Sequence, residues 1–173
     1  HYNNSKILAY TCNNGHLEVA QWLVKRFKIY FTDIDATSSR ILNRLLLDVA
    51  IRSRLEVLKW LATTFDLSSK YMLTLYKLFV RERTDAKHLE VAKWILEQIS
   101  PQDIKALKHD DSWAHLLREA PFSENCLEFM QWLIETYYLT LKDVSNRYYC
   151  LLTSLCRNGK RESAAWLVSK FKP

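Results

Sequence analysis

Glycine and proline are scarce in this sequence, with two glycines and three prolines in 173 residues. Average usage is about 7% for glycine and about 5% for proline, and a β-rich protein needs both residues in its many turns. The scarcity therefore argues against an all-β fold. It also argues against glycine-rich loops that cradle phosphate groups. Helices are the regular structure that remains.

Other features are absent as well. No apolar run approaches the roughly 18 residues that span a bilayer, and no signal-peptide pattern opens the chain. The four cysteines do not have the spacing of a disulfide framework or a zinc site; they are Cys12, Cys126, Cys150 and Cys156. We therefore expect free, buried thiols in a reducing intracellular compartment, cytoplasmic or nuclear.

The sequence does contain ample material for a core, since 49% of it is apolar and 13% aromatic, which argues against disorder. Five of its tryptophans are separated by 38, 34, 38 and 34 residues. Each has a glutamate four positions before it and an aliphatic residue directly after it. Periods of 20–50 residues indicate repeat architecture. The repeated tryptophans are Trp22, Trp60, Trp94, Trp132 and Trp166.

Each repeat predicts a pair of helices joined by a short turn. In the first repeat, Leu17, Ala20 and Leu23 follow the i, i+3 spacing of a helix that is apolar around most of its circumference. Polar turns containing Gly15 or Gly159 precede the tryptophan helix, and glycine suits the left-handed conformation that ends a helix. The helix before each turn has an apolar residue fifteen positions ahead of the tryptophan: Ile7, Leu45, Phe79, Leu117 and Leu151.

The segments between repeats begin with helix-start signals. Ser100-Pro-Gln-Asp103 combines an N-cap serine with a proline at the first helical position. Thr32–Asp35 and Thr140–Asp143 have the same spacing of cap and acid. We therefore expect short third helices in the longer linkers.

These patterns predict an all-α fold, an α-solenoid of about five helix-turn-helix repeats in a single domain spanning residues 1–173. The approximate repeats are residues 4–36, 37–68, 69–104, 110–143 and 145–173. Terminal repeats normally have a polar outer face, whereas the first and last repeats here stay apolar. The chain also begins with His1 rather than methionine. We therefore expect further repeats in a longer protein, or self-association through the uncapped ends.

The stretch from Asn13 to Val24, Asn-Asn-Gly-His-Leu-Glu-Val-Ala-Gln-Trp-Leu-Val, closely resembles the turn and second helix of an ankyrin repeat. Lys87–Leu96 is similar. The tryptophans and acidic linkers resemble the divergent ankyrin-type repeats of amoebae, oomycetes and giant DNA viruses. All repeats lack the Thr-Pro-Leu-His start of the ankyrin consensus and the glycine-containing β-hairpin finger. The linker helices are expected in place of those fingers.

The resemblance implies a scaffold for protein–protein recognition without catalysis or a cofactor. The repeated tryptophans then have two interpretations, either as core residues between repeats or as exposed anchors for a partner. Their recurrence among aliphatic neighbours favours the core. Trp113 lies outside the repeat spacing and fits either interpretation.

Two further groups of residues were considered for chemistry. His16 and His88 occupy the same repeat position, and Cys12 lies four residues before His16, but Gly15 interrupts a helical metal site. His109-Asp-Asp-Ser112 contains groups that acid–base catalysis uses, yet it also fits an N-cap region. We expect no metal site and no catalytic residue.

The net charge of +6 is uneven, because residues 1–85 hold 13 Lys+Arg against 8 Asp+Glu. Aligned turns of a solenoid would gather this excess into a basic ridge that attracts an acidic protein partner. The alternative is nucleic-acid or phosphate binding by the ridge, although the recurring glutamates oppose it. The basic turn residues are Arg52, Arg54, Arg81, Arg83, Lys87, Arg157, Lys160 and Arg161.

Overall fold

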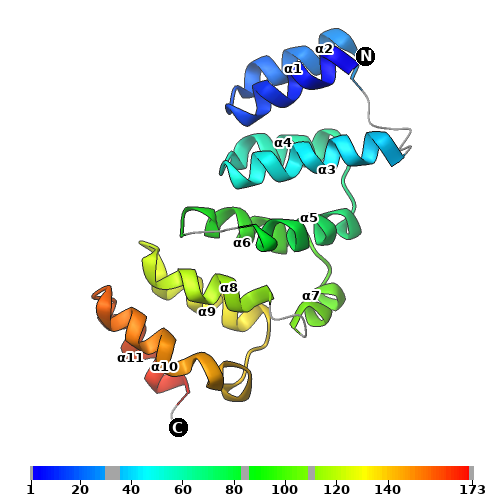
Figure 1. Cartoon of the computed structure of the whole chain (residues 1–173). Coiled ribbons are helices and arrows are strands. Elements are labelled where there is room, and N and C mark those ends of the chain that lie inside the picture. Colours follow the sequence, from blue (N-terminus) through cyan, green and yellow to red (C-terminus); the bar gives the residue numbers. More distant parts are fainter. Residues whose placement is uncertain (1, 30–35, 83–85, 109–111, 172–173) are drawn as a thin grey trace. The chain divides into compact units, whose positions relative to one another are not determined.

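The computed structural model describes residues 2–29, 36–82, 86–108 and 112–171, and over these ranges the chain is helical without any β-strand (Figure 1). The predicted all-α class is therefore confirmed. In chain order the elements are α1 (Tyr2–Asn13), α2 (Leu17–Phe27), α3 (Ala36–Ile51), α4 (Leu55–Thr64), α5 (Ser69–Arg81), the 3-10 helix η1 (Ala86–His88), α6 (Leu89–Glu97), α7 (Pro101–Leu107), α8 (Ser112–Glu119), the 3-10 helix η3 (Ala120–Phe122), α9 (Cys126–Thr136), α10 (Leu141–Arg157) and α11 (Arg161–Lys170). No helix in the described ranges combines the length and the apolar character that a membrane crossing requires.

The chain divides into two compact units. The first consists of His1–Glu82 and Glu90–Gln98, and the second of Arg83–Leu89 and Ile99–Pro173. The helices α1 to α5 belong to the first unit, together with nearly all of α6. The helices α7 to α11 belong to the second unit.

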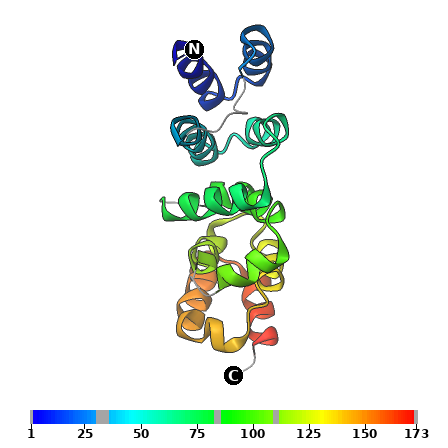
Figure 2. The same ribbon diagram turned by 90° about the vertical axis from the view of Figure 1, so that its right-hand side faces the viewer.

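Paired helices build the first unit. The helices α1 and α2 pack on each other, as do α3 and α4, and α3 also packs on α1 and on α5 (Figures 1 and 2). Leucines from the three stacked helices are fully buried, among them Leu8, Leu46 and Leu75. Burying an aliphatic side chain contributes about 1.5–3 kcal/mol, so the apolar stripe of each helix stabilises its contact with the next.

The second unit contains a further helix pair. The helix α10 packs on α11, α11 packs on α9, and η3 contacts α8, α9 and α10. Leu116, Leu133 and Leu155 are fully buried within this unit. Pro121 lies in η3 directly after α8, and because proline cannot donate to a helical hydrogen bond, it ends that helix.

The turns within the helix pairs have the predicted backbone. Gly15 and Gly159 have positive φ angles of 81° and 68°, a left-handed conformation that glycine adopts without steric cost. Ser53, at the same repeat position, has φ 55°. A Cβ placed on Gly15 would lie 3.1 Å from Arg54 Cδ, so the turn between α3 and α4 lies against the turn between α1 and α2.

Two of the three predicted helix starts in the linkers lie within the described residues. The short helix α7 begins at Pro101, and the hydroxyl of Ser100 accepts a hydrogen bond from the Asp103 N–H at 3.2 Å, which confirms the linker helix there. The helix start predicted at Thr140 is confirmed, because Thr140 caps α10. This helix continues for 17 residues because buried Val144, Tyr148 and later residues extend its apolar stripe. Thr32–Asp35 lies outside the described residues.

Candidate functional site

A groove of about 650 Å³ lies in the second unit, bordered by α8 and α10. Its apolar floor comes from Ala114 and Leu117 of α8 and Leu151 of α10, which are all buried. Phe122, the last residue of η3, lines the same groove and is 58% exposed. An exposed aromatic ring beside an apolar floor is the arrangement that binds a partner's apolar side chain. We call this surface the α8–α10 groove.

The rim of the α8–α10 groove is polar and mainly basic. Arg118, Glu119 and Arg147 line it together with His115 and Ser154. Arg118 Nε donates to the Glu119 carboxylate at 3.0 Å, in an exposed pair that is worth little energetically. The Arg147 guanidinium lies 5.6 Å from the ring centroid of Trp113, which is within cation–π range. The rim therefore favours a ligand that carries negative charge.

A second hollow of about 620 Å³ shares Phe122, Cys150 and Ser154 with the α8–α10 groove. Tyr149 and Arg157 also line it. Phe122 thus lines both depressions, and its exposed ring offers apolar contact area to a ligand in either. Arg157 is the one residue of the predicted basic ridge that borders this region.

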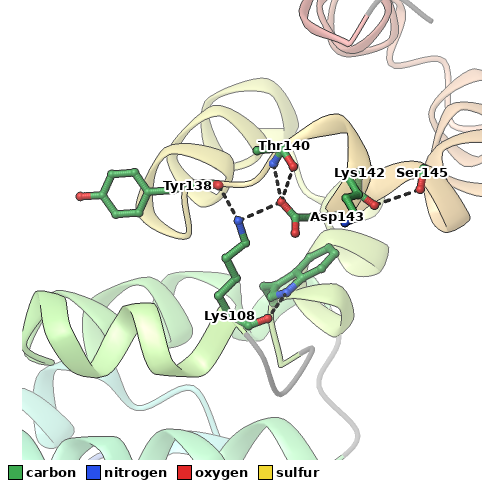
Figure 3. A network of polar contacts seen from close by, with 7 residues as sticks. Lys108, Tyr138, Thr140, Lys142, Asp143 and Ser145 are labelled. Carbon is green, nitrogen blue, oxygen red and sulfur yellow. Dashed lines mark hydrogen bonds and ion pairs between the residues drawn. The ribbon is translucent and has the colours of Figure 1, made fainter.

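A polar network holds the start of α10, one wall of the groove (Figure 3). The carboxylate of Asp143 accepts hydrogen bonds from the Thr140 N–H at 2.7 Å and the Thr140 hydroxyl at 2.6 Å. Lys108 Nζ lies 2.9 Å from the same carboxylate and donates to the Tyr138 carbonyl at 2.9 Å. Because Lys108 directly follows α7, it links that helix to the linker between α9 and α10.

This network changes the acidity of Asp143. Partial burial disfavours the charged form, but the hydrogen bonds from the Thr140 hydroxyl, Lys108 and the Thr140 N–H, together with the positive charge of Lys108, outweigh it. They lower the pKa of Asp143 from 3.8 to about 2. The carboxylate is therefore ionised at neutral pH and acts as a structural anchor for α10.

The predicted basic turn residues are divided between the two units. Arg52, Arg54, Lys87, Arg157 and Arg161 are exposed and Lys160 is half-buried. The side chain of Arg81 and the whole of Arg83 lie outside the described part of the chain.

Acidic residues interrupt the basic turn residues of the second unit. Lys160 and Arg161 line a shallow hollow together with Glu124, Glu128 and Glu162. The carboxylates reduce the positive potential at this point, because opposite charges a few ångströms apart largely cancel at longer range.

The repeated tryptophans are less buried than the core interpretation predicts. Trp60, Trp94, Trp132 and Trp166 are half-buried, and Trp22 is 57% exposed. For Trp22 the prediction of a core position is wrong, because no neighbouring helix in the described structure covers that side of α2.

Trp113, which fitted either interpretation, is the deeply buried tryptophan. It is 2% exposed, and its Nε1 donates to the Lys108 carbonyl at 3.2 Å.

The prediction of four buried thiols holds for half of them. Cys12 and Cys126 are buried, whereas Cys150 and Cys156 are exposed. Burial raises the pKa of Cys12 to about 12. Burial also raises the pKa of Cys126, although a hydrogen bond from Ser163 and the charge of Lys160 act in the opposite direction. A buried thiol with a raised pKa is inert.

The two histidines that share a repeat position differ in exposure. His16 is exposed and His88 is buried. Among the described residues, no three metal-ligating side chains lie close enough together to hold an ion. His109, Asp110 and Asp111 lie outside the described residues.

The α8–α10 groove was not predicted from the sequence. Phe122 occupies the position ten residues before Trp132, where the first two repeats have Cys12 and Ala50. A large aromatic ring at a position that is small elsewhere was the available signal. Phe122 follows Pro121, at a repeat position where the residue type varies from repeat to repeat.

Comparison of the chain with protein-family models, with curated protein sequences and with solved structures finds no match. The site is therefore interpreted from its own geometry and from the sequence repeat.

Proposed function

We propose that this chain is a non-catalytic protein-interaction scaffold, built as an α-solenoid of ankyrin-like helix pairs, that binds a protein partner through the α8–α10 groove. The observation that carries the proposal is the exposed ring of Phe122 beside a buried apolar floor. Interfaces concentrate their binding energy in such aromatic anchors surrounded by polar residues.

The solenoid part of the proposal is supported by sequence and packing together. The repeats recur five times in the sequence, and within the first unit α1, α3 and α5 pack in succession. Adjacent turns also lie together, as Gly15 and Arg54 do. Stacked helix pairs present side chains at fixed spacing, which suits recognition of an extended or helical peptide.

The chemistry of the rim defines the partner. Arg118 and Arg147 on the groove, and Arg157 on the adjoining hollow, favour a segment with carboxylates around an apolar side chain. An acidic protein segment is therefore the proposed ligand.

The test is selection of peptides from a displayed random library on the immobilised chain, followed by affinity measurement. Enriched peptides should combine apolar and acidic residues and bind about tenfold more weakly to Phe122→Ala, a loss of about 1.4 kcal/mol. Tyr10→Ala is the matched control, since Tyr10 is an exposed aromatic residue of α1, outside the groove. Failure to enrich any peptide, or equal effects of the two variants, would refute the groove as the binding site.

The alternative is a nucleic-acid or phosphate-binding solenoid that uses the basic turn residues. The exposed Arg52 and Arg54, both on the turn between α3 and α4, favour it within the first unit. The glutamates beside Lys160 and Arg161 oppose it in the second unit. Protein binding is thus the function that the described geometry favours.

A further inference from the structure

The two ends of the repeat series expose positions that are buried in the other repeats. One such position lies three residues before each repeated tryptophan. Val57 and Val91 occupy it in the second and third repeats and are each 2% exposed, whereas Val19 in the first repeat is 51% exposed. The side chain is valine in all three cases, so the difference comes from the surroundings alone.

The position fifteen residues before the tryptophan behaves in the same way. Leu45 and Phe79 are 3% and 0% exposed, but Ile7 is 50% exposed. Leu45 lies on α3, which packs on α1, and Phe79 lies on α5, which packs on α3. Both positions are therefore covered when another helix pair precedes their own. We call the exposed surface formed by Ile7, Tyr10, Val19 and Trp22 the leading face.

The same two positions are buried in the last helix pair of the second unit, α10 and α11. Leu151 lies fifteen residues before Trp166 and Ser163 lies three residues before it, and both are buried. Ser163 hydrogen bonds with Cys126 at the start of α9, and α11 packs on α9. The preceding helices thus cover the leading positions of α10 and α11.

The opposite surface of the last pair is also exposed. Ile134, two residues after Trp132, is 3% exposed, whereas Val168 at the same repeat position on α11 is 40% exposed. Met130 is fully buried, but Ala164, its counterpart on α11, is only half-buried. We call the surface formed by Ala164 and Val168 the trailing face.

We infer that the leading face of one molecule binds the trailing face of a second copy of this chain. Packing between successive helix pairs already joins these two kinds of surface within the chain, and the leading and trailing faces are their exposed counterparts on the first and last pairs. The inference rests on the proposed stacking of helix pairs but not on the groove. Because the two faces differ, the contact is head-to-tail and each added molecule leaves one face of each kind free.

The test uses sedimentation equilibrium across roughly 10 µM to 1 mM, which brackets weak association. The weight-average mass of the wild type should rise with concentration above the 20.5 kDa of the monomer. Val19→Asp on the leading face and Val168→Asp on the trailing face should each remain monomeric. Both positions are exposed, so an unchanged circular dichroism melt is expected for each. Gln102→Asp, on the exposed surface of α7, should associate like the wild type.

Mixing the two variants gives the decisive result. Val19→Asp retains an intact trailing face and Val168→Asp retains an intact leading face, so an equimolar mixture should form dimers and nothing larger. A contact between two leading faces would instead leave Val168→Asp associating alone. A wild type that stays monomeric throughout, or a mixture that does not dimerise, overturns the inference. Peptide binding by the groove is measured in a separate experiment. Failure of self-association and failure of peptide binding can therefore be distinguished.

Discussion

Tryptophan is the residue that best shows how the environment decides the role of a side chain in this protein. Five copies share one sequence context, yet Trp22 is exposed and the other four are half-buried. Trp113 has no repeat context and is buried to 2% exposure. Its indole N–H is satisfied by the Lys108 carbonyl, as a buried polar group requires.

Replacing Trp113 by alanine should therefore lower the free energy of unfolding by about 3–5 kcal/mol, the usual cost of removing a buried aromatic ring. Trp22→Ala should lower the free energy of unfolding by about 1 kcal/mol or less. It removes an exposed ring that makes only an edge contact with Phe27, with 6.1 Å between the ring centroids. Urea denaturation of dilute protein measures both values. Similar losses for the two variants would contradict the burial difference.

At the scale of elements, the first turn of α10 depends on one carboxylate. Asp143 accepts hydrogen bonds from Thr140 and Lys108, and its side chain is 25% exposed. Its folded-state pKa of about 2 lies below the ordinary 3.8. A lowered carboxyl pKa stabilises the folded state above the unfolded pKa, and the contribution is lost as the pH falls through the folded pKa.

Asp143→Asn should therefore destabilise the chain at neutral pH by about 1–3 kcal/mol. Its stability should also change less than that of the wild type between about pH 4 and pH 2. Urea denaturation as a function of pH measures both effects. Glu56→Gln is the control, because the pair of Glu56 with Lys59 is exposed and contributes about 0.5 kcal/mol or less.

Lys108→Met tests the same network at the start of α10 by removing the cation that pairs with Asp143. Loss of its hydrogen bond and positive charge should raise the pKa of Asp143 towards its ordinary value. Carbon-13 NMR titration of the carboxyl group measures this shift. An unchanged titration would show that Thr140 alone holds the carboxylate.

At the scale of the whole molecule, net charge and local charge pattern point to different partners. The chain carries +6, which attracts polyanions without any specific site. The turn between α10 and α11 nevertheless places Lys160 and Arg161 beside Glu124. We expect weak nucleic-acid binding that involves few phosphates.

Filter binding of RNA and DNA across a salt series measures this property. About two or three phosphate contacts would give a slope of log K against log salt of about −2 to −3. Reversing the charge of Arg52 and Arg54 to glutamate should abolish that binding and leave peptide affinity for the groove unchanged. Tight nucleic-acid binding with a slope steeper than about −6 would favour the nucleic-acid alternative.

The sequence by itself determined the local structure. Its apolar spacing predicted the helix pairs, and Gly15 and Gly159 predicted left-handed turns, because these features depend on backbone sterics and on the period of a single helix. Ser100 and Pro101 predicted the start of α7 for the same reason.

Only the tertiary structure decided which residues are covered. Val19 and Val57 have the same side chain and repeat position but opposite exposure, because burial depends on whether another helix pair packs against that side. The sequence marks Phe122 as unusual for its repeat position but does not reveal the groove, since Phe122, Leu117 and Leu151 come together only when η3 packs against α8 and α10. Local sequence specifies a helix and its apolar faces, while the neighbouring helices determine which of those faces remain available to a partner.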